Sequence, residues 1–116
     1  MSEATIYHNP RCSNSRGALA LLQERGIAPR VVDYLHAPLT AQELASLIAQ
    51  LGLPVRDVMR SKEAVYQDLD LGNARWTEAE LIDHIAAHPV LLNRPIVVTA
   101  KGAKLCRPPE LLLSIL

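Results

Sequence analysis

The spacing of apolar residues predicts a strand, a helix and a second strand at the start of the chain. Residues 4–7 form a short apolar run typical of a strand, and residues 30–35 form another after Pro29. Between them, residues 14–26 carry leucines at helical spacing and end with Gly26, a common residue at a helix C-terminus. The first third of the chain is therefore predicted to be one strand–helix–strand unit.

The middle of the chain predicts helices. Two Thr-x-x-Glu patterns, which are typical of capping boxes, predict helix starts at Thr40 and Thr77. Apolar residues follow each threonine at helical spacing, as far as a glycine in the first case and a His-Pro pair in the second. Residues 55–59 and 63–69 predict two shorter helical turns.

The C-terminal part predicts a β-hairpin and a last helix. Residues 96–99 are all β-branched and give the strongest strand signal in the chain. A turn at residues 101–102 leads to a short returning strand at 103–106, and the last helix is expected to start at 108–110. We expect these elements to form a single domain over residues 1–116, with the helical middle as an insertion.

The turn after the first strand carries the candidate chemistry. Cys12 lies where the strand leads into the helix, with Ser13 and Asn14 beside it as candidate caps. A thiol at this place faces the positive end of the helix dipole and free backbone N–H groups, which lower a thiol pKa and bind anions. A cysteine at this turn is typical of a thioredoxin-like α/β fold, with a mixed four-stranded sheet and flanking helices.

The residues around Cys12 indicate how its thiol works. Thioredoxin-type enzymes use Cys-x-x-Cys, but Ser15 takes the second position here, so an external thiol such as glutathione is implied. His8 is a candidate either to keep the thiol ionised as a nearby cation or to accept its proton, although a surface histidine without a role is equally ordinary. Ser13 and Ser15 are candidates to donate to the thiolate or to a bound oxyanion, or simply to cap the helix.

Three arginines lie at the edges of predicted elements. They are Arg60, Arg94 and Arg107, and the planar guanidinium suits them to bind a tetrahedral oxyanion. The sequence alone does not show that they lie together, and the alternative is that all three are independent surface arginines. Pro95 is a candidate cis-proline, because a cis-proline opens the third strand beside the active cysteine in thioredoxin-like folds. Arg94 would then lie next to Cys12.

The composition is that of a globular domain. Apolar residues make up 49% of the 116 residues, and 12 basic residues balance 12 acidic ones, which argues against broad nucleic-acid binding. No apolar run approaches the roughly 20 residues that span a bilayer, and the N-terminus lacks the features of a signal peptide. We therefore expect a cytoplasmic protein that binds neither nucleic acid nor membrane. In that compartment no disulfide is expected, and Cys106 is predicted to be a buried, inert thiol.

Three blocks of the sequence are similar to one known family. They are residues 6–13 (IYHNPRCS), 91–99 (LLNRPIVVT) and 102–108 (GAKLCRP), and the similarity runs from about residue 4 to the C-terminus. These blocks resemble the glutaredoxin-dependent arsenate reductases, which implies a thioredoxin-like fold with a helical insertion and no bound cofactor or metal. The resemblance also implies that Cys12 is the catalytic cysteine, that His8 helps to set its ionisation, and that the oxyanion is bound by Arg60, Arg94 and Arg107.

The same resemblance implies a reaction. The Cys12 thiolate attacks arsenate, which the arginines and the backbone N–H groups of the turn hold, and a thiol–arsenate adduct forms. Glutathione displaces water or hydroxide at the arsenic and drives reduction to arsenite, and glutaredoxin helps to restore the free cysteine. The implied partners are arsenate, glutathione and glutaredoxin, and the implied role is arsenic detoxification.

Other functions fit parts of the pattern. A glutathione-dependent thiol oxidoreductase of the same fold that does not act on arsenate stays open. An Spx-type regulator that binds RNA polymerase is disfavoured, because its redox switch generally uses Cys-x-x-Cys and this chain has Ser15 instead. A cysteine-based phosphatase is disfavoured because its signature places a longer loop between cysteine and arginine than the one from Cys12 to Arg16.

Overall fold

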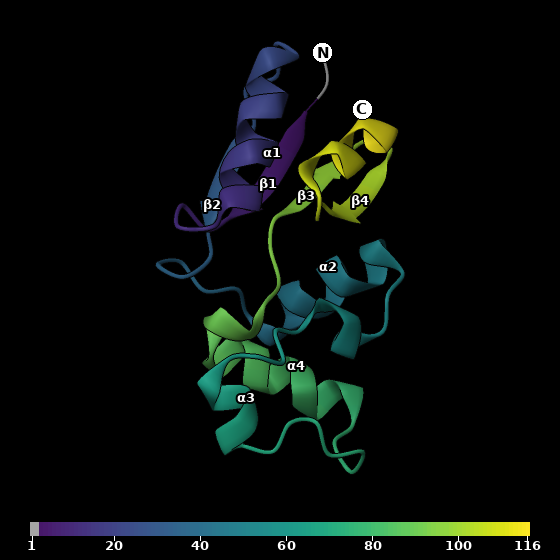
Figure 1. Cartoon of the computed structure of the whole chain (residues 1–116). Coiled ribbons are helices and arrows are strands. Elements are labelled where there is room, and N and C mark those ends of the chain that lie inside the picture. Colours follow the sequence, from purple (N-terminus) through teal and green to yellow (C-terminus); the bar gives the residue numbers. More distant parts are fainter. Residues whose placement is uncertain (1–2) are drawn as a thin grey trace. The chain divides into compact units, whose positions relative to one another are not determined.

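The computed structural model describes residues 3–116, and its backbone contacts divide the chain into two units (Figure 1). One unit takes the residues up to Ala37 and then Arg94–Leu116, and the other is Pro38–Asn93. The second unit is the helical insertion that the sequence predicts. The single domain expected over residues 1–116 stays a prediction.

A mixed four-stranded sheet forms the centre of the first unit. Its strand order is β2-β1-β3-β4, with β1 parallel to β2 and antiparallel to β3, and with β3 antiparallel to β4. This arrangement confirms the thioredoxin-like α/β sheet predicted from the sequence. The elements of this unit are β1 (Ala4–His8), α1 (Ser13–Glu24), β2 (Arg30–Asp33), β3 (Ile96–Thr99), β4 (Gly102–Leu105) and the 3₁₀ helix η3 (Pro109–Ile115).

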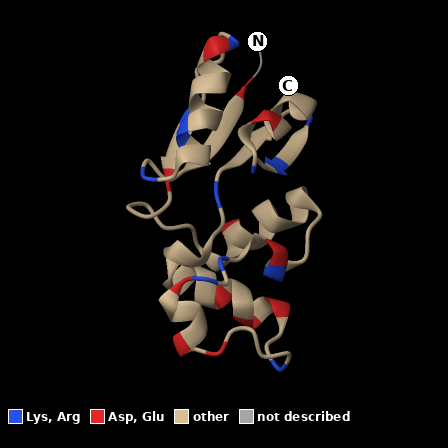
Figure 2. Ribbon diagram, viewed as in Figure 1, with Lys and Arg blue, Asp and Glu red and all other residues tan. Residues whose placement is uncertain are grey.

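The hydrophobic core of this unit fixes the end of β1. The central strands β1 and β3 carry no Lys, Arg, Asp or Glu and are tan along their length in Figure 2. Ile6 and Val97, which are register partners, are fully buried with Ala18 and Leu22 of α1. Burial of four such side chains stabilises the unit by roughly 1–3 kcal/mol each. The strand end that leads to Cys12 is therefore rigidly placed beside α1.

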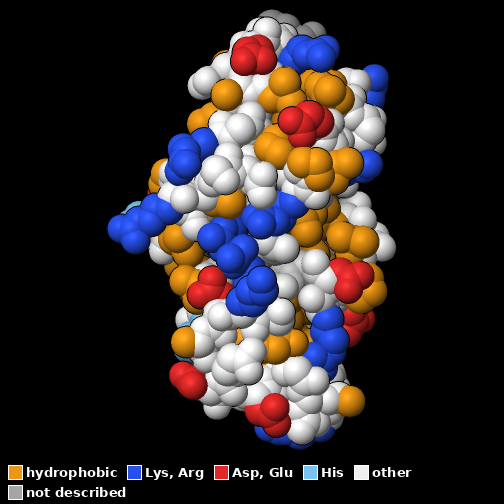
Figure 3. Space-filling model, in the orientation of Figure 1, with side chains coloured by type: hydrophobic (Ala, Val, Ile, Leu, Met, Phe, Trp, Pro, Cys, Tyr) orange, Lys and Arg blue, Asp and Glu red, His pale blue; other side chains and the backbone are white. Residues whose placement is uncertain are grey.

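The last segment of the chain packs on α1 and the hairpin. A Cβ built on Gly17 of α1 would meet Cγ of Pro109 at 3.0 Å, so a larger residue at this position would require Pro109 to shift away from α1. Leu112 and Ile115 of η3 are buried, whereas Leu111 and Leu113 are exposed, and Figure 3 shows hydrophobic side chains over this upper part of the molecule.

Several element boundaries differ from the sequence prediction. The strand β2 ends at Asp33 rather than at residue 35, because the carbonyl of Asp33 accepts turn hydrogen bonds from the N–H groups of His36 (3.1 Å) and Ala37 (2.9 Å). The strand β4 is Gly102–Leu105, one residue earlier than expected, and the last helix is a 3₁₀ helix. The strand β1 extends one residue further, to His8.

The second unit is helical, as predicted, and both capping boxes are present. Oγ1 of Thr40 accepts from the N–H of Glu43 at 3.1 Å, and the Thr40 N–H donates to the Glu43 carboxylate at 3.0 Å. Thr77 and Glu80 make the same pair of bonds. The helices α2 and α4 pack on each other. The elements are α2 (Ala41–Leu51), η1 (Val55–Val58), α3 (Ala64–Asp68), α4 (Glu78–Ala87) and η2 (Pro89–Leu91). Within residues 3–116, no helix has both the length and the apolar character that crossing a membrane needs.

Candidate active site

A short hydrogen-bonded turn carries the chain from β1 to α1. The side-chain oxygen of Asn9 accepts from the N–H of Arg11 at 3.0 Å, and the Asn9 carbonyl accepts from the N–H of Cys12 at 2.9 Å. The N–H of Asn9 in turn donates to Oγ of the buried Ser15 at 3.3 Å. These three bonds tie the turn to the first turn of α1 and fix the position of the cysteine.

Cys12 is the N-cap residue of α1. Its backbone is extended, with φ −91° and ψ 124°, and its carbonyl accepts from the N–H of Arg16 at 3.0 Å. Its side chain makes no capping bond to the helix. The expectation that Ser13 or Asn14 caps the helix was therefore wrong, because both residues already lie inside it. The thiol takes the place of an ordinary capping hydroxyl, next to the free N–H groups of the first helical turn.

These N–H groups favour the ionised thiol. Partial burial of Cys12 acts to raise its pKa, but hydrogen bonds oppose this and together lower the pKa to about 7. The bonds come from the backbone of Ser15, the side chain of Arg94, the side chain of Ser15 and the backbone of Asn14. A thiol with this pKa is about half ionised at neutral pH, whereas a free cysteine with a pKa near 8.5 is only a few per cent ionised. The predicted reactive thiolate thus has a physical cause.

Two of the three predicted arginines reach Cys12. Nη1 of Arg107 donates to Sγ of Cys12 at 3.6 Å and to the carbonyl of Arg94 at 2.9 Å. The side chain of Arg94 also hydrogen-bonds to the thiol. The Arg94–Pro95 peptide bond, the candidate from the sequence, is cis, and so is Arg107–Pro108, which the sequence interpretation did not single out. Two positive charges therefore lie at the thiol, and guanidinium groups suit an oxyanion.

Arg60 belongs to the other unit. Its Nε donates to the Glu63 carboxylate at 3.0 Å and its Nη1 donates to the Asn93 side chain at 3.3 Å. Its backbone N–H donates to the carbonyl of Leu91 at 2.8 Å. The guanidinium is thus held in one orientation within its own unit, and its part in oxyanion binding stays a prediction.

His8 lies at the end of β1 and is only 7% exposed. Burial lowers the pKa of its imidazole, the charge of Asp33 and a backbone hydrogen bond of Ser15 raise it, and the charge of Arg16 lowers it, with a net lowering. The neutral imidazole is therefore the main form at pH 7. Ser15 contacts both His8 and Cys12 and so links them.

Ser13 is exposed, and its predicted role in substrate binding stays a prediction.

Cys106 lies in a different environment from Cys12. It is fully buried, and its Sγ lies 3.5 Å from the carbonyl of Lys104, to which it donates. Burial raises the pKa of this thiol to about 11, so it stays protonated at neutral pH. These properties agree with the inert role predicted for it. Within residues 3–116, no cluster of His, Cys, Asp or Glu side chains is arranged to hold a metal ion.

The sequence matches the model of the ArsC family over residues 7–115. The chain belongs to the ArsC family. It is 47% identical to an arsenate reductase of Escherichia coli over 116 residues, which are all of this chain and 82% of that protein. It is 46% identical to an arsenate reductase of Haemophilus influenzae over 112 residues, which are 96% of this chain and 97% of that one.

The fold agrees with that of a solved ArsC relative. The structure of an arsenate reductase from Vibrio cholerae superposes with a TM-score of 0.96 at 48% sequence identity, over 98% of each chain. The mixed sheet and the strand order described above are thus those of a known member of the family, which confirms the resemblance seen in the sequence.

Some features of the site were missed in the sequence. The capping position of Cys12, the bond from Arg107 to the Arg94 carbonyl and the hydrogen bond of Ser15 to the turn all depend on contacts between distant or irregular segments. Asn9 is the one local signal for this turn in the sequence. Asparagine side chains often accept a hydrogen bond from the backbone two residues on, as Asn9 does here from Arg11.

We predict that the Cys12 thiol titrates near pH 7. The rate of alkylation by iodoacetamide, measured against pH in a Cys106→Ser variant, should reach half its maximum at about pH 7, since the hydrogen bonds at the helix start favour the thiolate. A Cys12→Ser variant that retains Cys106 is the control and should show little alkylation below pH 9. A midpoint at the free value of about 8.5 would contradict the electrostatic explanation.

Proposed function

We propose that this protein reduces arsenate to arsenite through the thiolate of Cys12. The observation that carries the proposal is the thiol at the N-terminus of α1, with its pKa lowered to about 7 and with Arg94 and Arg107 bonded to it. Arsenate is a tetrahedral oxyanion, so it can accept hydrogen bonds from guanidinium groups while its arsenic meets the sulfur. The arsenate reductases to which the chain is similar support this choice of substrate over phosphate or sulfate.

The proposed chemistry begins with attack on arsenic. The thiolate forms an S–As bond, and an oxygen of arsenate leaves as water after it takes up protons. Arg94 and Arg107, with Arg60 as a further ligand, would offset the negative charge that gathers on the arsenate oxygens. Ser13 and Ser15 are proposed as further donors to the oxyanion. The half-ionised state of Cys12 at pH 7 supplies the nucleophile.

Reduction of arsenic from the +5 to the +3 state needs two electrons. Two thiols can supply them by joining in a disulfide, and Ser15 rather than a second cysteine follows Cys12 in the helix. Cys106 is a poor candidate for the second thiol, because it is buried and protonated. We therefore propose glutathione as the co-substrate and glutaredoxin as the partner that releases Cys12 from its mixed disulfide. A cytoplasmic location, where both are reduced, fits this cycle.

A coupled assay tests the proposed function. NADPH, glutathione reductase, glutathione and glutaredoxin are mixed with the protein, and NADPH consumption is followed with and without arsenate. Consumption should depend on arsenate, and Cys12→Ser should abolish it while Cys106→Ser retains it. Turnover by Cys12→Ser would refute the mechanism. Activity on a small disulfide but not on arsenate would instead support the thiol oxidoreductase without arsenate activity.

The arginines make a separate prediction in the same assay. Arg107→Ala should lower kcat/KM for arsenate by about 10²-fold, which is a typical loss for one donor to a developing oxyanion. Arg60→Ala should also lose activity if Arg60 is an arsenate ligand. The neighbouring substitution Cys106→Ser is the control and should have a small effect. Equal losses in Arg107→Ala and Cys106→Ser would contradict the assignment and point to Cys106 as part of the redox cycle.

A further inference from the structure

Two buried polar atoms next to the active-site turn have no hydrogen-bond partner among residues 3–116. They are Nδ1 of His8 and Oδ1 of Asp33. Buried side-chain polar atoms are paired in the large majority of cases, so each exception needs an explanation. One of these two atoms can bind a proton and become a donor, and the other is a carboxylate oxygen that accepts.

The sheet places the two residues side by side. His8 is the last residue of β1, Asp33 is the last residue of β2, and they are register partners in the parallel pair. Neighbouring strands lie about 4.8 Å apart, and register partners project to the same face of a sheet. That face is the one that Ile6, two residues before His8, shares with α1. The imidazole and the carboxylate therefore project from neighbouring strand ends on the same face, and Nδ1 and Oδ1 are not hydrogen-bonded to each other in the structure.

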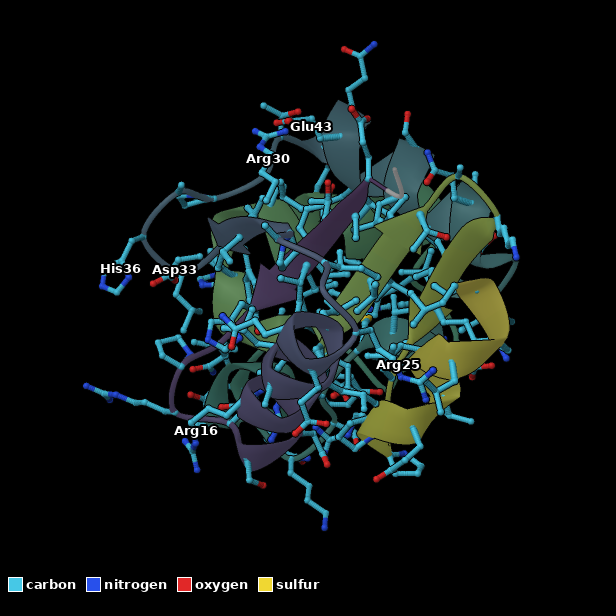
Figure 4. All side chains as sticks on the ribbon, turned by 90° about the horizontal axis from the view of Figure 1, so that it is seen from above. Arg16, Arg25, Arg30, Asp33, His36 and Glu43 are labelled. Carbon is cyan, nitrogen blue, oxygen red and sulfur yellow. The ribbon has the colours of Figure 1, made fainter. Side chains whose placement is uncertain are left out.

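The second oxygen of Asp33 is already occupied. Its Oδ2 lies 2.8 Å from Nδ1 of His36, whose side chain is 83% exposed, and Figure 4 shows these two side chains together at the outer end of β2. The hydrogen bond with His36 is the main cause that lowers the pKa of the Asp33 carboxyl. Asp33 therefore carries its charge at neutral pH, with Oδ2 directed to His36 and Oδ1 buried.

We propose that Asp33 is a positioning residue for His8: when the imidazole takes up a proton, its Nδ1–H donates to Oδ1 of Asp33 and forms an ion pair at the ends of β1 and β2. This bond satisfies both orphaned atoms at once. It also holds the ring in one orientation, in which the backbone of Ser15 still hydrogen-bonds to the imidazole. In this arrangement the bond from His36 to Oδ2 holds the Asp33 carboxylate in place.

The charges around His8 show what the ion pair would do. Burial disfavours the charged imidazole, Asp33 on β2 favours it, the Ser15 backbone favours it, and Arg16 on α1 disfavours it. Cys12 at the start of α1 and His36 behind Asp33 are the other titratable groups nearby. Asp33 is the charged side chain that raises the pKa of the imidazole against the effect of its burial. Without it, the pKa of His8 would be lower still.

The effect on catalysis rests on the proposed arsenate reduction, whereas the ion pair itself does not. A proton leaves the Cys12 thiol when the thiolate forms, and protons are needed when an oxygen leaves arsenate as water. An imidazole whose positive form is stabilised by Asp33 can take the first proton and return it. Positioned acid–base groups contribute roughly 10²–10⁴-fold to a rate, so the loss of their positioning should cost a part of this.

NMR titration of the His8 imidazole tests the ion pair directly. In Asp33→Asn, which keeps the shape but removes the charge, the pKa of His8 should fall below its value in the unchanged protein. The exposed Asp83→Asn substitution on α4 is the matched control and should leave the His8 titration unchanged. The same His8 pKa in Asp33→Asn and in the unchanged protein would overturn the proposal. Circular dichroism of both variants checks that the fold is retained.

Kinetics of the same variants test the positioning role. Asp33→Asn should lower kcat for arsenate by about tenfold with KM nearly unchanged, because the arginines that bind arsenate are intact. Asp83→Asn should match the unchanged protein in both constants. An unchanged kcat in Asp33→Asn would overturn the positioning role even if the ion pair exists. If the unchanged protein does not reduce arsenate, the proposed function fails, and the NMR titration still decides the ion pair.

Discussion

The structure depends on one set of hydrogen bonds at the start of α1. Cys12 takes the N-cap position, where a helix has N–H groups without internal partners, and its sulfur receives bonds from the Ser15 backbone and side chain and from Asn14. These bonds outweigh the partial burial of the thiol and bring its pKa to about 7. The same N–H groups that would bind a capping oxygen therefore stabilise a nucleophilic sulfur.

The rest of the unit positions this sulfur and keeps it distinct from the second thiol. The buried residues of β1, β3 and α1 fix the strand end, and the Asn9 turn joins it to Ser15. The segment after β4 brings Arg107 to Cys12 and to the carbonyl of Arg94. Cys106 directly precedes this arginine, yet burial raises its pKa to about 11. The two thiols thus differ because burial dominates at Cys106, whereas hydrogen bonds outweigh partial burial at Cys12.

Much of the fold could be predicted because its signals are local. The β-branched run at Ile96–Thr99 and the capping boxes at Thr40 and Thr77 depend on neighbouring residues alone. The end of β2 and the N-cap of α1 could not be placed, because turn bonds at Asp33 and the Asn9 turn decide them. Likewise, residue types indicated that Cys12 and arginines form an oxyanion site, but not which arginine bonds the sulfur. His8 and Asp33 are 25 positions apart, and strand pairing alone makes them neighbours.

The most direct test of the central claim is the pKa of Cys12 in Ser15→Ala, measured from the ultraviolet absorbance of the thiolate against pH in a Cys106→Ser background. Ser15 is buried and bonds to the sulfur, whereas Ser13 is exposed, so Ser13→Ala is the matched control. Ser15→Ala removes the side-chain bond to the sulfur but keeps the backbone N–H groups and Arg94. The pKa should therefore rise above about 7 while staying below the free value of about 8.5, and it should stay near 7 in Ser13→Ala. A pKa that is unchanged in Ser15→Ala would contradict the claim that the Ser15 hydroxyl is one of the hydrogen bonds that hold the thiolate.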